Sequence, residues 1–142
     1  MMSKKWFVFA SFCLFVTMQS FVLKSDKSVR FRQAAWNEIG KDAKAESKMI
    51  FVMVIADYCG VCKKMQNVLA DESVGSFYNQ NFINTAFDVE NPMQQFRASN
   101  WGVTGVPAMV FLDQKKNVVY KIQGYKNPEA MLKAAKTALA KR

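Results

Sequence analysis

From Phe31 onward, hydrophobic residues recur in blocks whose spacing is that of a helix in some stretches and of a buried strand in others. Between Phe31 and Ser47 they fall mostly three or four positions apart, with charged residues between them, which predicts an amphipathic helix. Met49 to Ala56 is a continuous apolar run rich in Val and Ile, and it is too short for a typical helix. Such a run predicts a strand buried on both faces, at the centre of a sheet.

The same patterns, together with turn and capping residues, predict the other elements. Asn127, Pro128 and Glu129 are typical of a helix start, because they supply an N-cap, a first-turn proline and an early acid. After residue 56 we predict a helix beginning within residues 59–62, a short helix at about 72–79, strands at 82–89, 108–112 and 118–123, and helices at 92–99 and 128–140. The last strand follows a polar turn and can return antiparallel to its neighbour. The pattern predicts an α/β fold with a central mixed β-sheet flanked by helices on both faces.

The first 20 residues have the layout of an export signal. Lys4 and Lys5 precede an uncharged run from Trp6 to Met18, and polar residues return from Gln19 onward. The run is shorter than the roughly 20 residues that a spanning helix needs, although extension through Leu23 would give a marginal one. We predict a signal peptide or membrane anchor at residues 1–20, a short polar connector at 21–29 and one domain at 30–142.

Cleaved or retained, this segment places the domain on the far side of a membrane, because the positive charges precede the apolar run. No Ala-x-Ala pattern marks a cleavage site, and cuts after Met18 or Ser20 are both conceivable. Two alternatives are an internal hydrophobic helix and lipid attachment at Cys13, which Phe12 disfavours because lipid-attachment signals want a small residue there. Export predicts an oxidising or redox-managed compartment.

Composition narrows the chemistry. The 142 residues suit one domain, and the net charge of +9 is scattered over several elements rather than gathered in one stripe, so nucleic-acid binding is not predicted. The sequence has no His, which excludes His-based metal sites and both Ser-His and Cys-His catalysis. Cys13 lies in the N-terminal apolar run, so the domain holds only Cys59 and Cys62.

A Cys-x-x-Cys pair at a strand-to-helix junction is typical of redox chemistry. The helix N-terminus favours a thiolate on the first sulfur, which makes Cys59 the candidate nucleophile. Cys62 lies one turn further along the helix and can attack a mixed disulfide to release the partner. A structural disulfide, half of an intermolecular zinc site and two unreactive buried thiols are the alternatives. We predict neither a bound metal nor a cofactor.

Two segments resemble the thioredoxin superfamily, and the likeness extends from about Arg30 to Lys141. Cys59-Gly60-Val61-Cys62-Lys63 is similar to the family's active-site segment, and Trp101 to Ala108 is similar to the segment that carries its cis-proline. The resemblance implies a thioredoxin-like fold in which Pro107 is cis and faces the cysteines, while the Val106 backbone pairs with an extended substrate. A trans loop proline is the alternative. The implied substrate-binding residues are Tyr58, Gly60, Val61, Val106 and Pro107.

Some positions depart from the family pattern. Met53 lies six positions before Cys59, where thioredoxins carry a buried Asp that helps to deprotonate the second cysteine, and Thr85 stands where we align the accompanying Lys. Water, groups of the substrate or Glu90 would then accept that proton, so we expect the resolving step to be slower or to depend differently on pH. Asp57 is interpreted as a solvated turn residue.

The leading hypothesis is therefore an exported protein thiol–disulfide oxidoreductase, with the reductase direction favoured. Its expected partners are protein disulfides or dithiols and a membrane-bound electron donor. It would touch the membrane only through an uncleaved N-terminal segment and would be a monomer. The resemblance to small exported thioredoxin-like domains implies a bacterial periplasm or cell envelope. A redox-inactive binding module and a dedicated electron relay for a membrane thiol interchange protein are the competing hypotheses.

Overall fold

The computed structural model describes residues 27–142, so the signal or anchor predicted at residues 1–20 lies outside the described part. In chain order its elements are α1 (Trp36–Ala45), β1 (Met49–Ile55), α2 (Gly60–Leu69), α3 (Glu72–Asn81), β2 (Phe82–Asp88), α4 (Pro92–Asn100), β3 (Ala108–Leu112), β4 (Val118–Gln123) and α5 (Pro128–Ala140). Within residues 27–142, no helix has the length and apolarity needed to span a membrane.

The four strands form one mixed sheet in the order β2-β1-β3-β4. β1 runs parallel to β2 and antiparallel to β3, and β4 returns antiparallel to β3. The apolar run at Met49–Ile55 is therefore a central strand, and its first six residues are fully buried. The predicted α/β class and the antiparallel return of the last strand are both confirmed.

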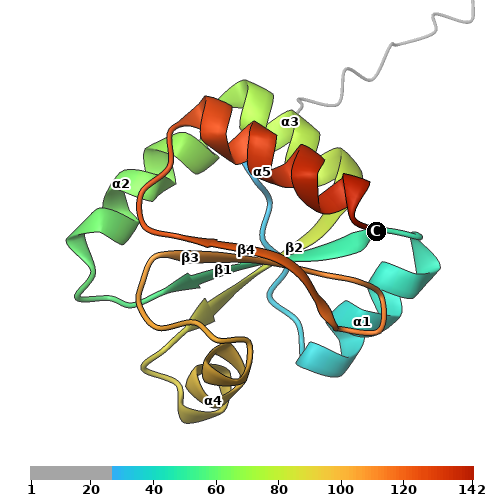
Figure 1. Ribbon diagram of the computed structural model, residues 1–142, viewed down its shortest axis with the longest axis horizontal. Coiled ribbons are helices and arrows are strands. Elements are labelled where there is room, and N and C mark those ends of the chain that lie inside the picture. The colour runs from blue at the N-terminus through green and yellow to red at the C-terminus, as the bar shows by residue number, and fades with distance from the viewer. Residues whose placement is uncertain (1–26) are drawn as a thin grey trace, which may run out of the picture.

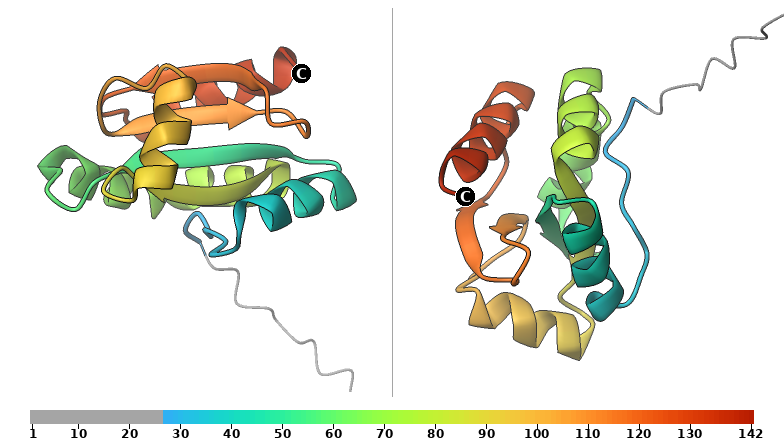
Figure 2. Two further views of the ribbon diagram at one scale, coloured as in Figure 1. Left: turned by 90° about the horizontal axis from the view of Figure 1, so that it is seen from below. Right: turned by 90° about the vertical axis from the view of Figure 1, so that its right-hand side faces the viewer.

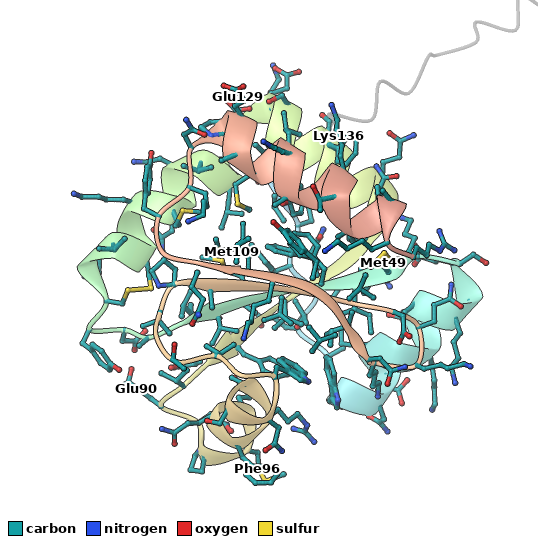
Figure 3. All side chains as sticks on the ribbon, in the orientation of Figure 1. Met49, Glu90, Phe96, Met109, Glu129 and Lys136 are labelled. Atoms are coloured by element: carbon teal, nitrogen blue, oxygen red, sulfur yellow. A yellow bond between two sulfur atoms is a disulfide. The ribbon has the colours of Figure 1, made fainter. Side chains whose placement is uncertain are left out.

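Helices cover both faces of this sheet, with α2, α3 and α5 on one side and α1 and α4 on the other (Figures 1 and 2). Successive side chains of β1 point to opposite faces, which divides the core in two. The α3/α5 core contains Met49, Phe51, Met53, Met65, Tyr78, Phe82, Met109, Phe111 and Met131. The α1/α4 core contains Ile39, Ile50, Val52, Val54, Ile83, Phe87, Ala98 and Val110. Met49 and Met109 are labelled in Figure 3.

Tyr78 brings a polar group into the α3/α5 core. Its hydroxyl donates to the Met131 carbonyl at 2.9 Å, which links α3 to α5. Burial raises the pKa of Tyr78 far above its ordinary value, so the phenol remains a neutral donor throughout the neutral range. Because the donor is satisfied, the core accommodates the hydroxyl without an unpaired polar group at that position.

The helix predicted from Phe31 begins only at Trp36, and the residues before it run as an extended strap along the domain. The Val29 amide donates to the Leu69 carbonyl at 2.8 Å, and the Arg32 amide donates to the Asn84 carbonyl at 2.8 Å. Phe31 packs against the α3/α5 core. These tertiary hydrogen bonds replace those of a first helical turn, so local spacing misplaced the helix start. Val29, assigned to the connector, is buried in the strap.

Candidate active site

The two cysteines of the domain meet where β1 passes into α2, and they are joined in a disulfide whose Cα atoms lie 5.2 Å apart (Figure 3). Cys59 is the N-cap of α2, and its sulfur accepts a hydrogen bond from the Cys62 amide at 3.1 Å. No acidic residue lies in the first turn of α2. The amide and the helix dipole therefore both favour negative charge on the Cys59 sulfur when the bond is reduced.

The disulfide rests on an apolar floor. Cys59 and Cys62 are only 8% and 5% exposed, and Ala56, Val89 and Val106 pack against them. Val89 reaches this position because its amide donates to the Ile55 carbonyl at 3.0 Å, which extends the pairing of the sheet to the edge of the site. Among residues 27–142, no hydrogen bond to the Cys62 sulfur matches the one that the Cys59 sulfur accepts, so the two sulfurs lie in unequal surroundings.

The loop from Trp101 to Pro107 forms the opposite side of the site. The Val106–Pro107 peptide bond is cis, and the Pro107 carbonyl accepts from the Gly124 amide at 2.8 Å. At the start of this loop, Trp101 stacks on Phe87 with ring centroids 5.3 Å apart. The loop is thus attached at one end to the α1/α4 core and at the other to β4.

Two residues of β4 that our sequence analysis did not single out hold this loop in place. The Gln123 side-chain oxygen accepts from the amides of Thr104 at 2.9 Å and Gly105 at 3.2 Å. The Lys121 ammonium donates to the carbonyls of Trp101 and Gly102. Two polar residues spaced two apart share one face of a strand, and that alternation was the sequence feature that could have indicated them.

The other predicted site residues surround the disulfide. Tyr58 is 75% exposed and Val61 is 42% exposed, while Gly60 is the first residue of α2 with open space where a side chain would project. On the Tyr58 side lies a depression of about 240 Å³. Its lining comprises Tyr58, Val89, Gln95, Ala98, Ser99, Val103, Thr104, Gly105 and Val106. The structure therefore brings Tyr58 and Val106 together.

Met53 and Thr85 lie on opposite faces of the sheet. Met53 is buried in the α3/α5 core, and its register partner on β2 is Ala86. Thr85 belongs to the opposite face of the sheet, where its hydroxyl donates to the Arg32 carbonyl at 3.2 Å. Because neighbouring residues of a strand point to opposite faces, the Met53 and Thr85 side chains do not meet.

Three carboxylates, those of Asp57, Asp88 and Glu90, lie close together next to the segments that form the site. One Glu90 oxygen accepts from the Asp57 amide at 3.0 Å, and the Glu90 amide donates to Asp88 at 2.9 Å (Glu90 is labelled in Figure 3). Asp57 is exposed, as expected. The three side chains could each offer one oxygen within 4.8 Å of the others. Calcium takes about six to eight oxygens, so this exposed arrangement does not by itself make a metal site.

Replacing Gln123 tests whether it holds the loop. Gln123→Leu removes the shared acceptor, so we expect hydrogen exchange at the Thr104 and Gly105 amides to accelerate by roughly tenfold, the equivalent of about one hydrogen bond. Gln123→Glu keeps an acceptor oxygen and should leave both amides protected. Unchanged exchange in Gln123→Leu, measured by NMR, would show that the loop is held by other contacts.

Comparison of the sequence with models of protein families identifies the family of the chain. Residues 36–139 match a family model described as a thioredoxin-like domain. No curated protein sequence matches the chain.

Solved structures give the same result. A protein of Bacteroides thetaiotaomicron assigned as a disulphide isomerase is 29% identical, with a TM-score of 0.70 over 79% of this chain and 93% of that one. A thioredoxin from Thermus thermophilus is 26% identical, with a TM-score of 0.70 over 80% and 89% of the two chains. The oxidised C-terminal domain of DsbD from Neisseria meningitidis, 18% identical over 81% of this chain and all 100% of that one with a TM-score of 0.62, shares the fold.

The family match spans both the cysteine motif and the loop that faces it, which are the parts that build the site. Because that match extends over most of the chain, the protein belongs to the thioredoxin-like domain family of the thioredoxin superfamily.

Proposed function

We propose that the protein is an exported thiol–disulfide oxidoreductase that reduces disulfides of other proteins. The observation that carries this proposal is the Cys59–Cys62 disulfide at the start of α2, with the Cys59 sulfur as the N-cap acceptor. The likeness to a thioredoxin and to a protein assigned as a disulphide isomerase supports the same chemistry. The exposed surface beside the disulfide supports access by a partner protein.

Both steps of the proposed reaction use only these two cysteines. In the reduced protein, the Cys59 thiolate attacks one sulfur of a partner disulfide, the partner's S–S bond breaks, and its other sulfur leaves as a thiolate. Cys62 then loses its proton and attacks the Cys59 sulfur, which releases the partner's second thiolate. Two electrons pass to the partner, and the Cys59–Cys62 bond remains. A membrane-bound donor of the kind expected from the sequence would restore the dithiol.

The loop opposite the cysteines is the proposed substrate-binding element. A partner strand would pair with the backbone at Val106, next to Pro107, while Tyr58, Gly60 and Val61 contact its flanking residues. Support comes from the packing of Val106 against the cysteines and from the exposure of Tyr58 and Val61. The hydrogen bonds from Thr104 and Gly105 to Gln123 hold the loop in position before the partner arrives.

The reduction potential of the cysteine pair tests the redox proposal and its direction. Equilibration in glutathione and dithiothreitol buffers should give a value near the thioredoxin value of about −270 mV, whereas an oxidant would lie nearer −120 mV. Cys62→Ser should accumulate a mixed disulfide with a partner, and Cys59→Ser should not. If the cysteine pair never cycles between dithiol and disulfide in any buffer, the binding-module hypothesis remains. If the pair cycles rapidly but reduces generic protein disulfides only slowly, the dedicated relay is favoured.

The pH profile of the resolving step tests the effect of Met53. A buried Cys62 without the family's carboxylate should resolve a mixed disulfide at a rate that rises by about tenfold per pH unit across the neutral range, following its thiolate fraction. Met53→Asp should flatten that profile, because the new carboxylate can accept the proton. Met53→Asn is the matched control without a base. Identical profiles for wild type and Met53→Asp, followed after rapid acid quenching, would refute this account.

Export is proposed from the apolar run after Lys4 and Lys5. When the full chain is expressed in a bacterium, we expect it in the envelope fraction, and mass spectrometry of its N-terminus should show cleavage near Met18 or Ser20 or a retained anchor. A variant without residues 1–20 should stay in the cytoplasm. Full-length chain in the cytoplasmic fraction would contradict export without affecting the redox chemistry.

A further inference from the structure

A second and larger groove lies on the other side of the disulfide, between α2 and the connection from β4 to α5, which lie on the same side of the sheet in Figure 1. Its volume is about 790 Å³. We call it the α2 groove, and it is lined by Val61, Lys64, Asn67, Val68, Ala70, Asp71, Tyr125 and Pro128. Its walls differ entirely from those of the depression beside Tyr58.

The α2 groove starts at the cysteine motif and runs along the helix. Val61, Lys64 and Val68 are spaced three and four apart and therefore share one helix face. From Val61 to Ala70, nine positions on at the C-cap of α2, the lining extends roughly 14 Å at the rise of an α-helix. An extended chain advances about 3.3 Å per residue, so this length fits four or five residues.

The apolar lining is open to a partner. Val68 is buried and forms part of the floor, while Val61 is 42% exposed and Tyr125 is 50% exposed. Tyr125 is held in place through its neighbour Lys126, whose amide donates to the Met65 sulfur of α2 at 3.3 Å. Exposed apolar side chains that border a groove are typical of a binding site for another apolar group.

The charges in the α2 groove are unequal. The Asp71 carboxylate caps α3 by accepting from the amides of Ser73 at 2.9 Å and Val74 at 3.3 Å. Its hydrogen bond with the Ser73 side chain, followed by those amides, lowers the pKa of Asp71, so it stays ionised while one of its oxygens caps α3. Lys64 forms no ion pair with another side chain of residues 27–142. The positive charge of Lys64 therefore lies within one helical turn of the cysteine motif, and the negative charge of Asp71 lies at the far end of the lining.

We propose that the α2 groove binds an extended segment of the disulfide-bearing partner, four or five residues long, that carries an apolar side chain and a carboxylate. The apolar side chain lies between Val61, Val68 and Tyr125, and the carboxylate pairs with Lys64. This proposal rests on the proposed redox function, because the segment starts beside the sulfur that reacts. It adds a preference for acidic, apolar sequence on one side of the partner's cysteine.

Peptides with a single activated cysteine test the proposal. Each peptide carries its cysteine as a mixed disulfide with nitrothiobenzoate; Cys59 bonds to the peptide sulfur, the S–S bond breaks, and the coloured nitrothiobenzoate thiolate leaves. Three extensions, placed before or after the cysteine, contain Leu with Glu, Leu with Lys, or only Gly and Ser. The reduced protein is recovered from cells that express the full chain.

We expect the Leu and Glu extension, on one side of the cysteine, to react roughly tenfold faster than the Gly and Ser extension and about threefold faster than the Leu and Lys extension. Lys64→Glu should reverse the charge preference, and Tyr125→Ser should reduce the preference for Leu. Lys63→Glu is the matched control, because it makes the same charge change one position earlier on an exposed residue outside the groove.

Equal rates for the three extensions would overturn the proposal. Equal effects of Lys63→Glu and Lys64→Glu would also overturn it, because the charge preference would then come from the overall charge of the protein and not from Lys64. Reaction with glutathione disulfide separates these outcomes from failure of the proposed function. A protein that cycles with glutathione but ignores the extensions lacks only the groove preference. A protein that cycles with neither lacks the redox function itself.

Discussion

The hydrogen bond from the Cys62 amide to the Cys59 sulfur is the contact around which the site is organised. It makes the sulfur part of the helix end, so the position of the proposed nucleophile is held by the backbone of α2. That arrangement depends on β1, which is buried on both faces and delivers the chain to this point. The same amide can donate to a disulfide sulfur or to a thiolate, so the change of redox state requires no new partner within α2.

The second half of the site depends on β4, the edge strand of the sheet. Lys121 and Gln123 extend from that strand to the loop at Trp101–Pro107, and the Gly124 amide binds the Pro107 carbonyl. β3 lies between β1 and β4, so both halves of the site are attached to the same sheet. These hydrogen bonds hold the middle of the loop as well as its ends, so the loop keeps a fixed position relative to the disulfide.

Much of the fold could be predicted because its signals are local. The apolar run at Met49–Ile55 and the capped start of α5 indicate their elements within a few residues. What failed depends on tertiary contacts. The extended strap before Trp36 is held by hydrogen bonds to Leu69 and Asn84, distant in sequence, and spacing alone could not reveal them.

The candidate site shows the same division. Cys59 and Cys62 follow from their motif and from their place at a strand-to-helix junction, which are both readable along the chain. The role of Gln123 cannot be predicted from the neighbouring sequence, because it depends on β4 lying beside the loop at Thr104. The separation of Met53 from Thr85 follows from a register that only the paired strands determine, since one position decides which face a side chain occupies.

The burial of the disulfide restricts the partners that can reach it. Cys59 is 8% exposed, whereas Tyr58 and Val61 stand out beside it at 75% and 42%. A flat folded surface would meet those two side chains before its own sulfur came within bonding distance of Cys59. A partner cysteine carried on a narrow, extended segment meets fewer of these protruding side chains. The proposed reaction would therefore favour disulfides in flexible or unfolded segments, whose order of reactivity would then follow from the contacts proposed on either side of the sulfur.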